Sequence, residues 1–247
     1  RKSRDHTEHM FNYLKVPIKI LSKKNYDLIK INGGKKIRSF NYKIPSDISS
    51  SAFFIVLTTL TTNSKLKIKN VNINPSRVGI IKILNKMGVK IFLKNIKNYK
   101  GEKIADIYVK STKLLKAIKC PPKLNAATID EFLIIFLVAA KAKGVSVFKE
   151  LSELNQKESP RLKWGSKILK LMGVKTITTN DSIKIFGNPS LAIEKKIVIK
   201  DYLKDHRVFM TCVIAALSFG GEWSIHDRDS IQTSFPSFLK IIENLKK

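Results

Sequence analysis

Lys86-Met87-Gly88-Val89-Lys90 recurs later in the chain as Leu171-Met172-Gly173-Val174-Lys175. Each copy follows apolar residues spaced as in an amphipathic helix, at 78–86 and 162–171, and precedes an alternating pattern typical of a strand. The glycine stands where the end of a helix favours a residue in the left-handed conformation. The two copies therefore predict one structural unit that occurs twice, with the pentapeptide between a helix and a strand.

The predicted unit extends outward from these anchors and occurs almost three times. An extended segment leads to a loop with aspartate, a very apolar helix, a strand, a polar loop and the amphipathic helix, and two strands complete the order βαβαββ. Aspartate is a good helix N-cap, so Asp47, Asp130 and Asp205 are predicted to start the apolar helices. The apolar helices are predicted at 50–61, 131–143 and 208–219, the strands after them at 66–71, 145–151 and 223–227, the polar loops at 74–77, 157–161 and 233–236, and the closing strands at 90–93, 104–110, 175–178 and 182–186.

The predicted fold class follows from the two kinds of helix. Uniformly apolar helices belong in the interior and amphipathic helices at the surface. The units therefore predict an α/β (α+β) fold, in which repeated βαβαββ units surround buried helices and all their loops gather at one end. A helix at 7–14 and strands at 15–21 and 26–31 fit the end of a preceding unit, and 41–45 is predicted to be a hinge between two domains.

Composition narrows the class of protein. The chain has 247 residues, of which 43% are hydrophobic, enough for one large domain or two modest ones. Its longest apolar runs are about half of what a bilayer requires, so we expect no membrane segment. No signal peptide opens the chain, so we expect a cytoplasmic protein. Because the first residue is Arg1 rather than Met, we also expect it to be a portion of something longer.

The net charge of +28 raises the question of nucleic-acid binding. The excess is lysine spread evenly along the chain, with abundant Ile and Asn, which is typical of an A+T-rich genome. No arginine stripe or aromatic stacking platform accompanies it, so nucleic-acid binding is the weaker interpretation. Cys120 and Cys212 lack metal-ligand spacing and the four histidines show no zinc pattern, so no metal site is predicted.

Seven arginines stand among forty lysines, and two of them belong to the most informative motifs. Arginine is a planar, permanently charged, bidentate donor that suits carboxylates and phosphates. Lys157-Glu158-x-x-Arg161 could share protons while the arginine holds an anion, or it could be a solvated helix start. Asp205-His206-Arg207 opens a buried helix, where unpartnered charges are costly, so we favour a functional site over a simple cap.

Three further helix starts carry candidate residues with open alternatives. Asp130 and Glu131 precede a very apolar helix, where one carboxylate could cap and the other could be desolvated into a general base. The stretch 47–51 could bind an anion or cap a helix. Ser3 and Arg4 suit a phosphate, whereas Asp5 to Glu8 could form a capping box on a surface loop.

Taken together in this order, the motifs resemble the 5-enolpyruvylshikimate-3-phosphate synthase family. The resemblance covers essentially the whole chain. It implies the enolpyruvyl transferase fold, an inverse α/β barrel of βαβαββ units, with 1–43 the C-terminal part of one domain and 44–247 most of a second. The matching motifs are Ser3-Arg4-Asp5-His6-Thr7-Glu8, Asp47-Ile48-Ser49-Ser50, Asn74-Pro75-Ser76-Arg77, Ile129-Asp130-Glu131, Lys157-Glu158-Ser159 with Arg161, Asp205-His206-Arg207 and Thr233-Ser234-Phe235-Pro236.

The resemblance also implies an activity and roles for residues. The family joins shikimate 3-phosphate to phosphoenolpyruvate and releases phosphate, without a cofactor, and we expect a monomer that binds no nucleic acid. Asp130 would take the proton of the substrate hydroxyl and, with Ser3 and Lys157, contact shikimate 3-phosphate. Lys157 and Glu158 would handle proton transfer, whereas phosphoenolpyruvate would be bound by Arg161, Arg207 and His206.

The chain departs from the family pattern at a few positions, and two alternatives remain. Pro160 stands where Asp is usual, Asn155-Gln156 where Arg-Val is usual, and Thr233 where some members have lysine, while the family's N-terminal contacts lie before Arg1. One alternative is a UDP-N-acetylglucosamine enolpyruvyl transferase, which shares the fold and phosphoenolpyruvate. The Asp-His-Arg and Lys-Glu-Ser pairings, and the lack of that enzyme's cysteine loop, argue against it. The other alternative is a non-catalytic basic nucleic-acid-binding module.

Overall fold

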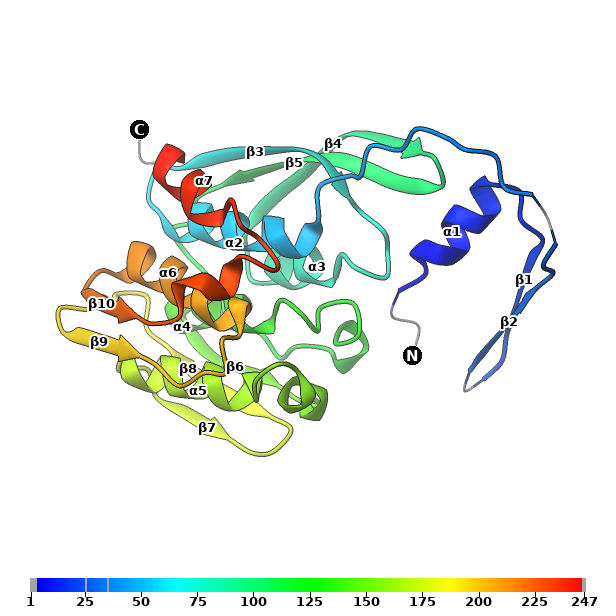
Figure 1. The fold of residues 1–247 in the computed structure, drawn as a ribbon. Helices are drawn as coiled ribbons and strands as arrows, with labels where there is room; N and C mark the ends of the chain where they lie inside the picture. The colour runs from blue at the N-terminus through cyan, green and yellow to red at the C-terminus, as the bar shows by residue number, and fades with distance from the viewer. Residues whose placement is uncertain (1–3, 25, 35, 246–247) are drawn as a thin grey trace.

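A computed structural model describes residues 4–24, 26–34 and 36–245 (Figure 1). Its helices are α1 (His6–Tyr13), α2 (Ile48–Leu60), α3 (Gly79–Lys86), α4 (Phe132–Lys141), α5 (Arg161–Leu171), α6 (His206–Phe219) and α7 (Phe238–Leu245). Its strands are β1 (Ile18–Ser22), β2 (Asp27–Ile31), β3 (Lys65–Asn72), β4 (Lys90–Tyr99), β5 (Glu102–Lys110), β6 (Gly144–Phe148), β7 (Thr176–Thr178), β8 (Ile183–Gly187), β9 (Lys196–Ile199) and β10 (Glu222–Ile225). The helices and most of the strands predicted from the sequence are present, whereas the extended segments before α2 and α4 form only isolated bridges.

The repeat is visible in the sheets. In two successive units the last strand pairs antiparallel with both others, giving the orders β3-β5-β4 and β6-β8-β7. The strand before the buried helix runs parallel to the strand after it, as β9 does to β10. In the first two units that strand is reduced to isolated parallel bridges, from Ser46 to Val71 and from Lys119 to Val147. The order βαβαββ predicted from the sequence is therefore confirmed.

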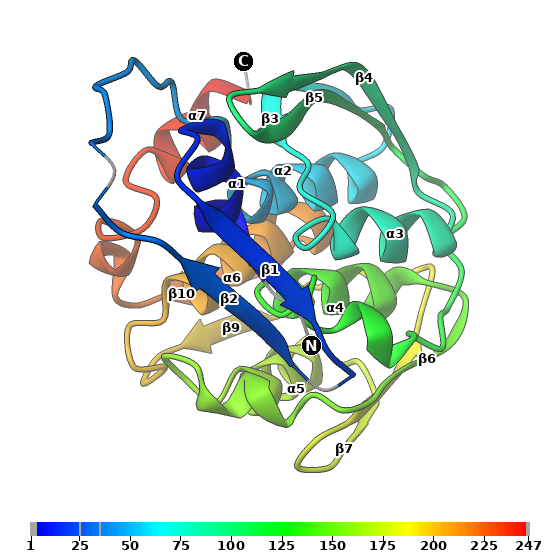
Figure 2. The same ribbon diagram turned by 90° about the vertical axis from the view of Figure 1, so that its right-hand side faces the viewer.

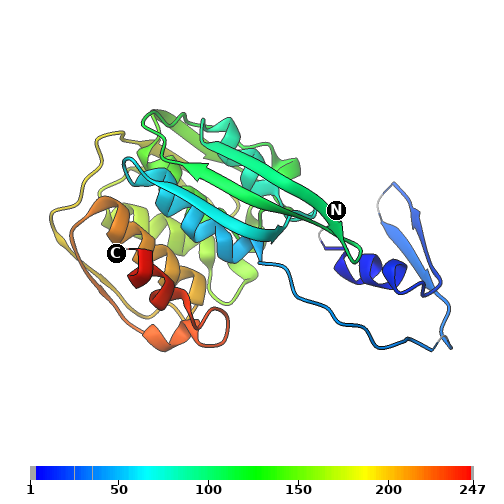
Figure 3. The same ribbon diagram turned by 90° about the horizontal axis from the view of Figure 1, so that it is seen from above.

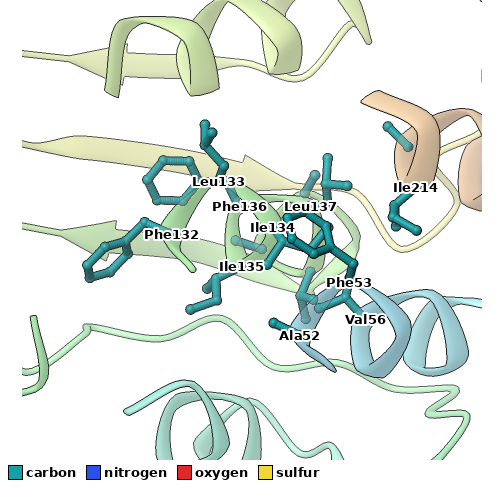
Figure 4. Close-up of a cluster of buried hydrophobic side chains, with 14 of the residues drawn as sticks. Ala52, Phe53, Val56, Phe132, Leu133, Ile134, Ile135, Phe136, Leu137 and Ile214 are labelled. Carbon is teal, nitrogen blue, oxygen red and sulfur yellow. The ribbon is translucent and has the colours of Figure 1, made fainter. Parts of the chain in front are cut away.

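The core lies where the three apolar helices α2, α4 and α6 meet (Figure 4). All residues of α4 from Phe132 to Ala140 are buried, because this helix is apolar on every side and neighbouring elements cover each face. Phe53 of α2 and Ile214 of α6 belong to the same cluster. Among the described residues, no helix is both long enough and apolar enough to cross a membrane.

The first part of the chain lies to one side of this body (Figures 1 and 3) and in front of it in the view of Figure 2. The hairpin β1–β2 and helix α1 are joined to α2 through an extended segment, whose described residues form no helix and only an isolated bridge at Ser46. Helix α1 rests against the end of the β4–β5 hairpin, where His6 Nδ1 lies 2.6 Å from Glu102 Oε1. The start of α1 is thereby brought next to the starts of the buried helices.

One prediction about helix starts is wrong, one alternative is excluded, and one strand is longer than predicted. Asp47 and Asp205 cap α2 and α6, accepting from Ser50 N at 2.8 Å and Arg207 N at 2.9 Å. Asp130 does not cap α4, which begins two residues later with Glu131 at the N-cap position, because cations bind the Asp130 carboxylate.

The alternative of a capping box from Asp5 to Glu8 is not what the structure has. Asp5 makes no side-chain capping bond for α1, and its Oδ1 accepts from Asn74 Nδ2 at 2.7 Å. Strand β4 runs on to Tyr99 because it pairs with β5 beyond a bulge at Lys94 and Lys97. Its side chains there are mostly exposed, so the apolar alternation that predicts strands from sequence is missing.

Candidate active site

Asp130 is the centre of a cluster of cations that come from separate parts of the fold. Its side chain is 10% exposed. Arg4, just before α1, binds Oδ2, and Arg207 at the start of α6 donates to the Asp130 backbone oxygen at 2.9 Å. Three further side chains face the carboxylate: Arg161 Nη1 at 3.5 Å, Arg77 Nη1 at 3.8 Å and Lys157 Nζ at 3.9 Å.

These contacts arise because equivalent loops of the repeated units open at the same end of the domain. Arg77 precedes α3, Arg161 begins α5 and Arg207 stands in the first turn of α6. Widely separated predicted residues are thus brought together, namely Asp130, Lys157, Glu158, Arg161, His206 and Arg207. Ser3, the remaining predicted site residue, lies outside the described residues.

The charge balance at Asp130 favours its ionised form. Burial by itself would raise the pKa of this carboxyl, but the positive charges of Arg207, Arg4, Lys157 and Arg77 outweigh burial and hold the pKa below its ordinary value. Asp130 is therefore a carboxylate at neutral pH. The cations around Asp130 also pair with other carboxylates, namely Asp47, Glu153, Glu158 and Asp205. An anionic ligand can compete with these carboxylates for the arginine and lysine side chains.

Arg161 is fixed by a buried ion pair with Asp205. Its side chain is 2% exposed and that of Asp205 is fully buried, with Arg161 Nε donating to Asp205 Oδ2 at 2.8 Å. Ser159 Oγ donates to the same oxygen at 2.8 Å. Burial would raise the pKa of Asp205, but Arg161 and these hydrogen bonds lower it below its usual value. Asp205 thus both caps α6 and orients an arginine, a second role that the sequence did not indicate.

The Pro160 departure from the family pattern is compatible with this geometry. Pro160 occupies the N-cap position of α5 and accepts from Trp164 N at 3.0 Å through its carbonyl. A residue there needs no N–H for the helix ladder, so proline removes no hydrogen bond. Its neighbours Ser159 and Arg161 both reach Asp205.

Lys157 and Glu158 lie at the more open edge of the cluster. Glu158 binds Arg161 Nη2 while about half of its side chain stays exposed. Lys157 Nζ lies 3.3 Å from Glu153 Oε1 as well as near Asp130, and its side chain is one-quarter exposed. Both groups can therefore approach a ligand bound over Asp130.

His206 is a neutral member of the cluster at neutral pH. Burial lowers the pKa of its imidazole below the ordinary value, and the neighbouring charge of Arg207 lowers it further. Asp205 acts in the opposite direction without reversing the shift. His206 can consequently donate or accept a hydrogen bond here, but it adds no positive charge for holding anions.

Glu131 is the carboxylate that the structure desolvates. Its residue exposure is 2%, and Ser49 Oγ donates to its Oε1. Burial raises the pKa of Glu131 to about 7, against the lowering effects of Arg207, Ser49 and Arg77. Of the two carboxylates that the sequence left open, neither is a side-chain cap, and the desolvated one is Glu131 rather than Asp130.

Arg77 was noticed in a motif without a role, and Arg4 was considered only as one of two residues suited to a phosphate. A compositional signal could have selected them, because four of the seven arginines in this lysine-rich chain surround Asp130: Arg4, Arg77, Arg161 and Arg207. The Asp47–Ser51 stretch, left open as an anion site, uses the Ser50 amide for the cap.

The cysteines take no part in this cluster. Both are buried, and burial raises the pKa of Cys120 to about 11 and raises that of Cys212 further still. Neither thiol is activated as a nucleophile. Within the described residues, no three His, Cys, Asp or Glu side chains are grouped so that they could hold a metal ion.

Comparison with known proteins shows where this architecture occurs. A family model described as EPSP synthase (3-phosphoshikimate 1-carboxyvinyltransferase) matches residues 1–242. A curated relative of that name from Thermodesulfovibrio yellowstonii is 38% identical over 247 residues, covering 100% of this chain and 56% of the relative.

Solved structures agree with the sequence match. EPSP synthase from Acinetobacter baumannii superposes with a TM-score of 0.89 at 35% identity, covering 99% of this chain and 55% of that one. The enolpyruvyl transferase NikO from Streptomyces tendae has a TM-score of 0.71 at 14% identity, covering 95% and 51%, which shows the shared enolpyruvyl transferase fold. The chain spans about half the length of the curated relatives that it matches. Since the family model matches nearly all of it, the chain belongs to the EPSP synthase family.

Proposed function

We propose that the site around Asp130 takes part in transferring the enolpyruvyl group of phosphoenolpyruvate to shikimate 3-phosphate, with release of phosphate. The observation that carries this proposal is the convergence of five cationic side chains on Asp130, four at its carboxylate and Arg207 at its backbone oxygen. Both substrates carry several negative charges, so arginine and lysine side chains gathered around a proton acceptor suit them. The names of the relatives support the same activity.

In this proposal Asp130 accepts the proton of the shikimate 3-phosphate hydroxyl. The hydroxyl oxygen bonds to the central carbon of phosphoenolpyruvate, and the bond from that carbon to the phosphate oxygen later breaks. Arg4 and Arg77 now neutralise Asp130, which makes it a weak base. Anionic substrates compete for these cations, so their binding should raise the basicity of Asp130 at the moment it is needed.

The other roles follow from position. Lys157 and Glu158, at the open edge, would protonate and deprotonate the enolpyruvyl carbons and assist the leaving phosphate. Arg207 and Arg161 would bind phosphoenolpyruvate, with neutral His206 as a hydrogen-bonding neighbour. Lys157 would contact shikimate 3-phosphate beside Asp130, and the resemblance to the family adds Ser3 to the residues that bind this substrate.

The test is phosphate release from shikimate 3-phosphate and phosphoenolpyruvate by the protein at its full natural length. Asp130→Asn should lower turnover by about 10²–10⁴-fold, because the amide cannot accept the proton. Asp181→Asn is the matched control, since Asp181 is exposed and its carboxylate accepts a local hydrogen bond from Thr179 Oγ1. The proposal is refuted if the wild-type protein releases no phosphate when both substrates are present.

The two alternatives are tested in the same preparation. A UDP-amino sugar offered in place of shikimate 3-phosphate should give no phosphate release. Binding to duplex DNA should be weak and should disappear as salt rises, because dispersed lysines give only non-specific attraction. The family match favours neither alternative.

The proposal also covers the domain organisation, the cellular location and the oligomeric state of the protein. Residues 1–43 and 44–247 would belong to two domains that meet at the Asp130 cluster. The protein would act in the cytoplasm as a monomer, without a cofactor or nucleic acid. Sedimentation of the full natural length at several concentrations tests the monomer.

A further inference from the structure

Glu131 lies at the end of a buried chain of polar contacts that the proposed reaction does not use. Ser49 at the start of α2 donates its hydroxyl to Glu131 Oε1, and Arg77 Nη2 donates to the same hydroxyl at 2.5 Å. Glu131 and Ser49 are buried, with exposures of 2% and 1%. A buried carboxylate is costly unless polar partners compensate for the lost hydration, and here the Ser49 hydroxyl is the direct partner.

Arg77 contacts both the Ser49 hydroxyl and the Asp130 carboxylate. Its Nη1 lies 3.8 Å from Asp130 Oδ2, and its Nη2, which also contacts Ser49, lies 3.7 Å from Asp47 Oδ1. One guanidinium therefore joins Glu131, through Ser49, to Asp130. Any change in the charge of Glu131 alters how strongly Arg77 is attracted to Asp130.

The loop that carries Arg77 is held firmly in place. Gly79 N donates to Ala127 O at 3.1 Å, and a Cβ on Gly79 would lie only 1.9 Å from Thr128 Oγ1. On its other side, Asn74 Nδ2 donates to Asp5 Oδ1 at 2.7 Å. Arg77 can thus change partners only by small rotations of its side chain.

Charged groups from each neighbouring element face Glu131. They are Arg77 from the loop before α3, Arg207 from α6 and the adjacent Asp130, while α2 contributes the Ser49 hydroxyl. Burial raises the pKa of Glu131 to about 7 in spite of both arginines, so its charge changes across the neutral range. The Asp130 carboxylate stays ionised over that range.

We propose that Glu131 is a positioning residue, which acts through Ser49 and Arg77 to set the basicity of Asp130. This inference rests on the proposed function of Asp130. When Glu131 is ionised, it shares the positive charge of Arg77, and Asp130 becomes a better proton acceptor. When Glu131 is protonated, Arg77 is attracted mainly to Asp130, and proton transfer slows.

The activity test uses Glu131→Gln, which retains shape and an acceptor for Ser49 but carries no charge. In the protein at its full natural length, wild-type turnover should rise as the pH passes about 7, and the Gln variant should lack this rise. Its turnover above neutral pH should fall by about tenfold, with KM for both substrates within about threefold of wild type. Ser49→Ala removes the hydroxyl that links Glu131 to Arg77 but removes no charge, and it should also reduce turnover.

Glu243→Gln is the matched control, because Glu243 is an exposed glutamate on α7, outside the cluster. It should retain the wild-type pH profile. A purely structural role for Glu131 predicts that the Gln variant keeps the rise near pH 7. An unchanged rise in that variant overturns the inference and leaves the proposed function intact.

A measurement that does not depend on turnover separates the coupling of Glu131 to Asp130 from the proposed enolpyruvyl transfer. In protein labelled with [13Cγ]aspartate, the Asp130 resonance is identified by its loss in Asp130→Asn. In wild type it should shift as Glu131 titrates near pH about 7, and the shift should vanish in Glu131→Gln. If that shift persists, the inference is wrong. If the shift vanishes but wild type releases no phosphate, the proposed function fails and the coupling of Glu131 to Asp130 stands.

Discussion

Asp205→Asn should destabilise the fold strongly, because it removes the charge partner of a buried arginine. Arg161 is 2% exposed and Asp205 is fully buried, and Nε to Oδ2 is 2.8 Å. Removing one member of such a pair costs about 3–5 kcal/mol. Arg161 keeps its contacts with Glu158 and Asp130, which places the expected loss near the lower end, at about 3 kcal/mol.

Urea unfolding followed by tryptophan fluorescence measures this loss, since Trp164 is buried in α5 beside the pair. The expected loss moves the midpoint down by about 1 M. Asp205→Ala should cost about 1 kcal/mol more, because it also removes the cap that Asp205 provides to Arg207 N. Asp229→Asn is the control, since its pair with Lys204 is exposed and should change the midpoint little.

The stability that the Asp205 charge contributes should decrease in acid. The folded-state pKa of Asp205 is lowered, so its charge stabilises the fold fully above the unfolded-state value of about 3.9 and less as the pH falls through the folded value. The gap between wild type and Asp205→Asn should therefore be constant at neutral pH and narrow in acid. If Asp205→Asn loses no more stability than Asp229→Asn, the buried pair does not hold Arg161 in place.

Three further outcomes are expected. In the protein at its full natural length, Glu158→Gln should keep substrate binding but lower phosphate release by about 10²–10⁴-fold, and near-normal turnover would remove Glu158 from the mechanism. Arg207→Lys should raise KM for phosphoenolpyruvate, because a point charge replaces a planar fork, whereas the same change at exposed Arg228 should not, and equal effects would refute the role. Gly79→Ala should lower the melting temperature, with a cost of about 1–3 kcal/mol, because its Cβ would overlap Thr128. Gly33→Ala is the control, since a Cβ there meets open space and should leave the melting temperature unchanged. An unchanged melting temperature for Gly79→Ala would show that α3 can shift.

The local sequence was sufficient to predict the helices and most strands, because their apolar patterns involve residues only a few positions apart. The all-apolar stretch of α4 has no polar face to offer solvent, so a buried helix was its only stable form. The two glycine pentapeptides marked helix ends, and Gly88 and Gly173 do adopt positive φ, of 92° and 82°. Where a strand is exposed on its faces, as at the far end of β4, the pattern disappears and the boundary was missed.

The amino-acid sequence by itself determined the repeated unit, its buried helices and the motifs that match the family, since each depends on residues a few positions apart. Only the tertiary structure decided how neighbouring residues divide their roles. Asp130 and Glu131 are adjacent in the turn before α4, but their carboxyl groups have different partners. One carboxyl therefore enters a cluster of cations supplied by distant loops, and the other enters a dry contact with Ser49. The pKa of each depends on neighbours that the chain brings together only when it folds.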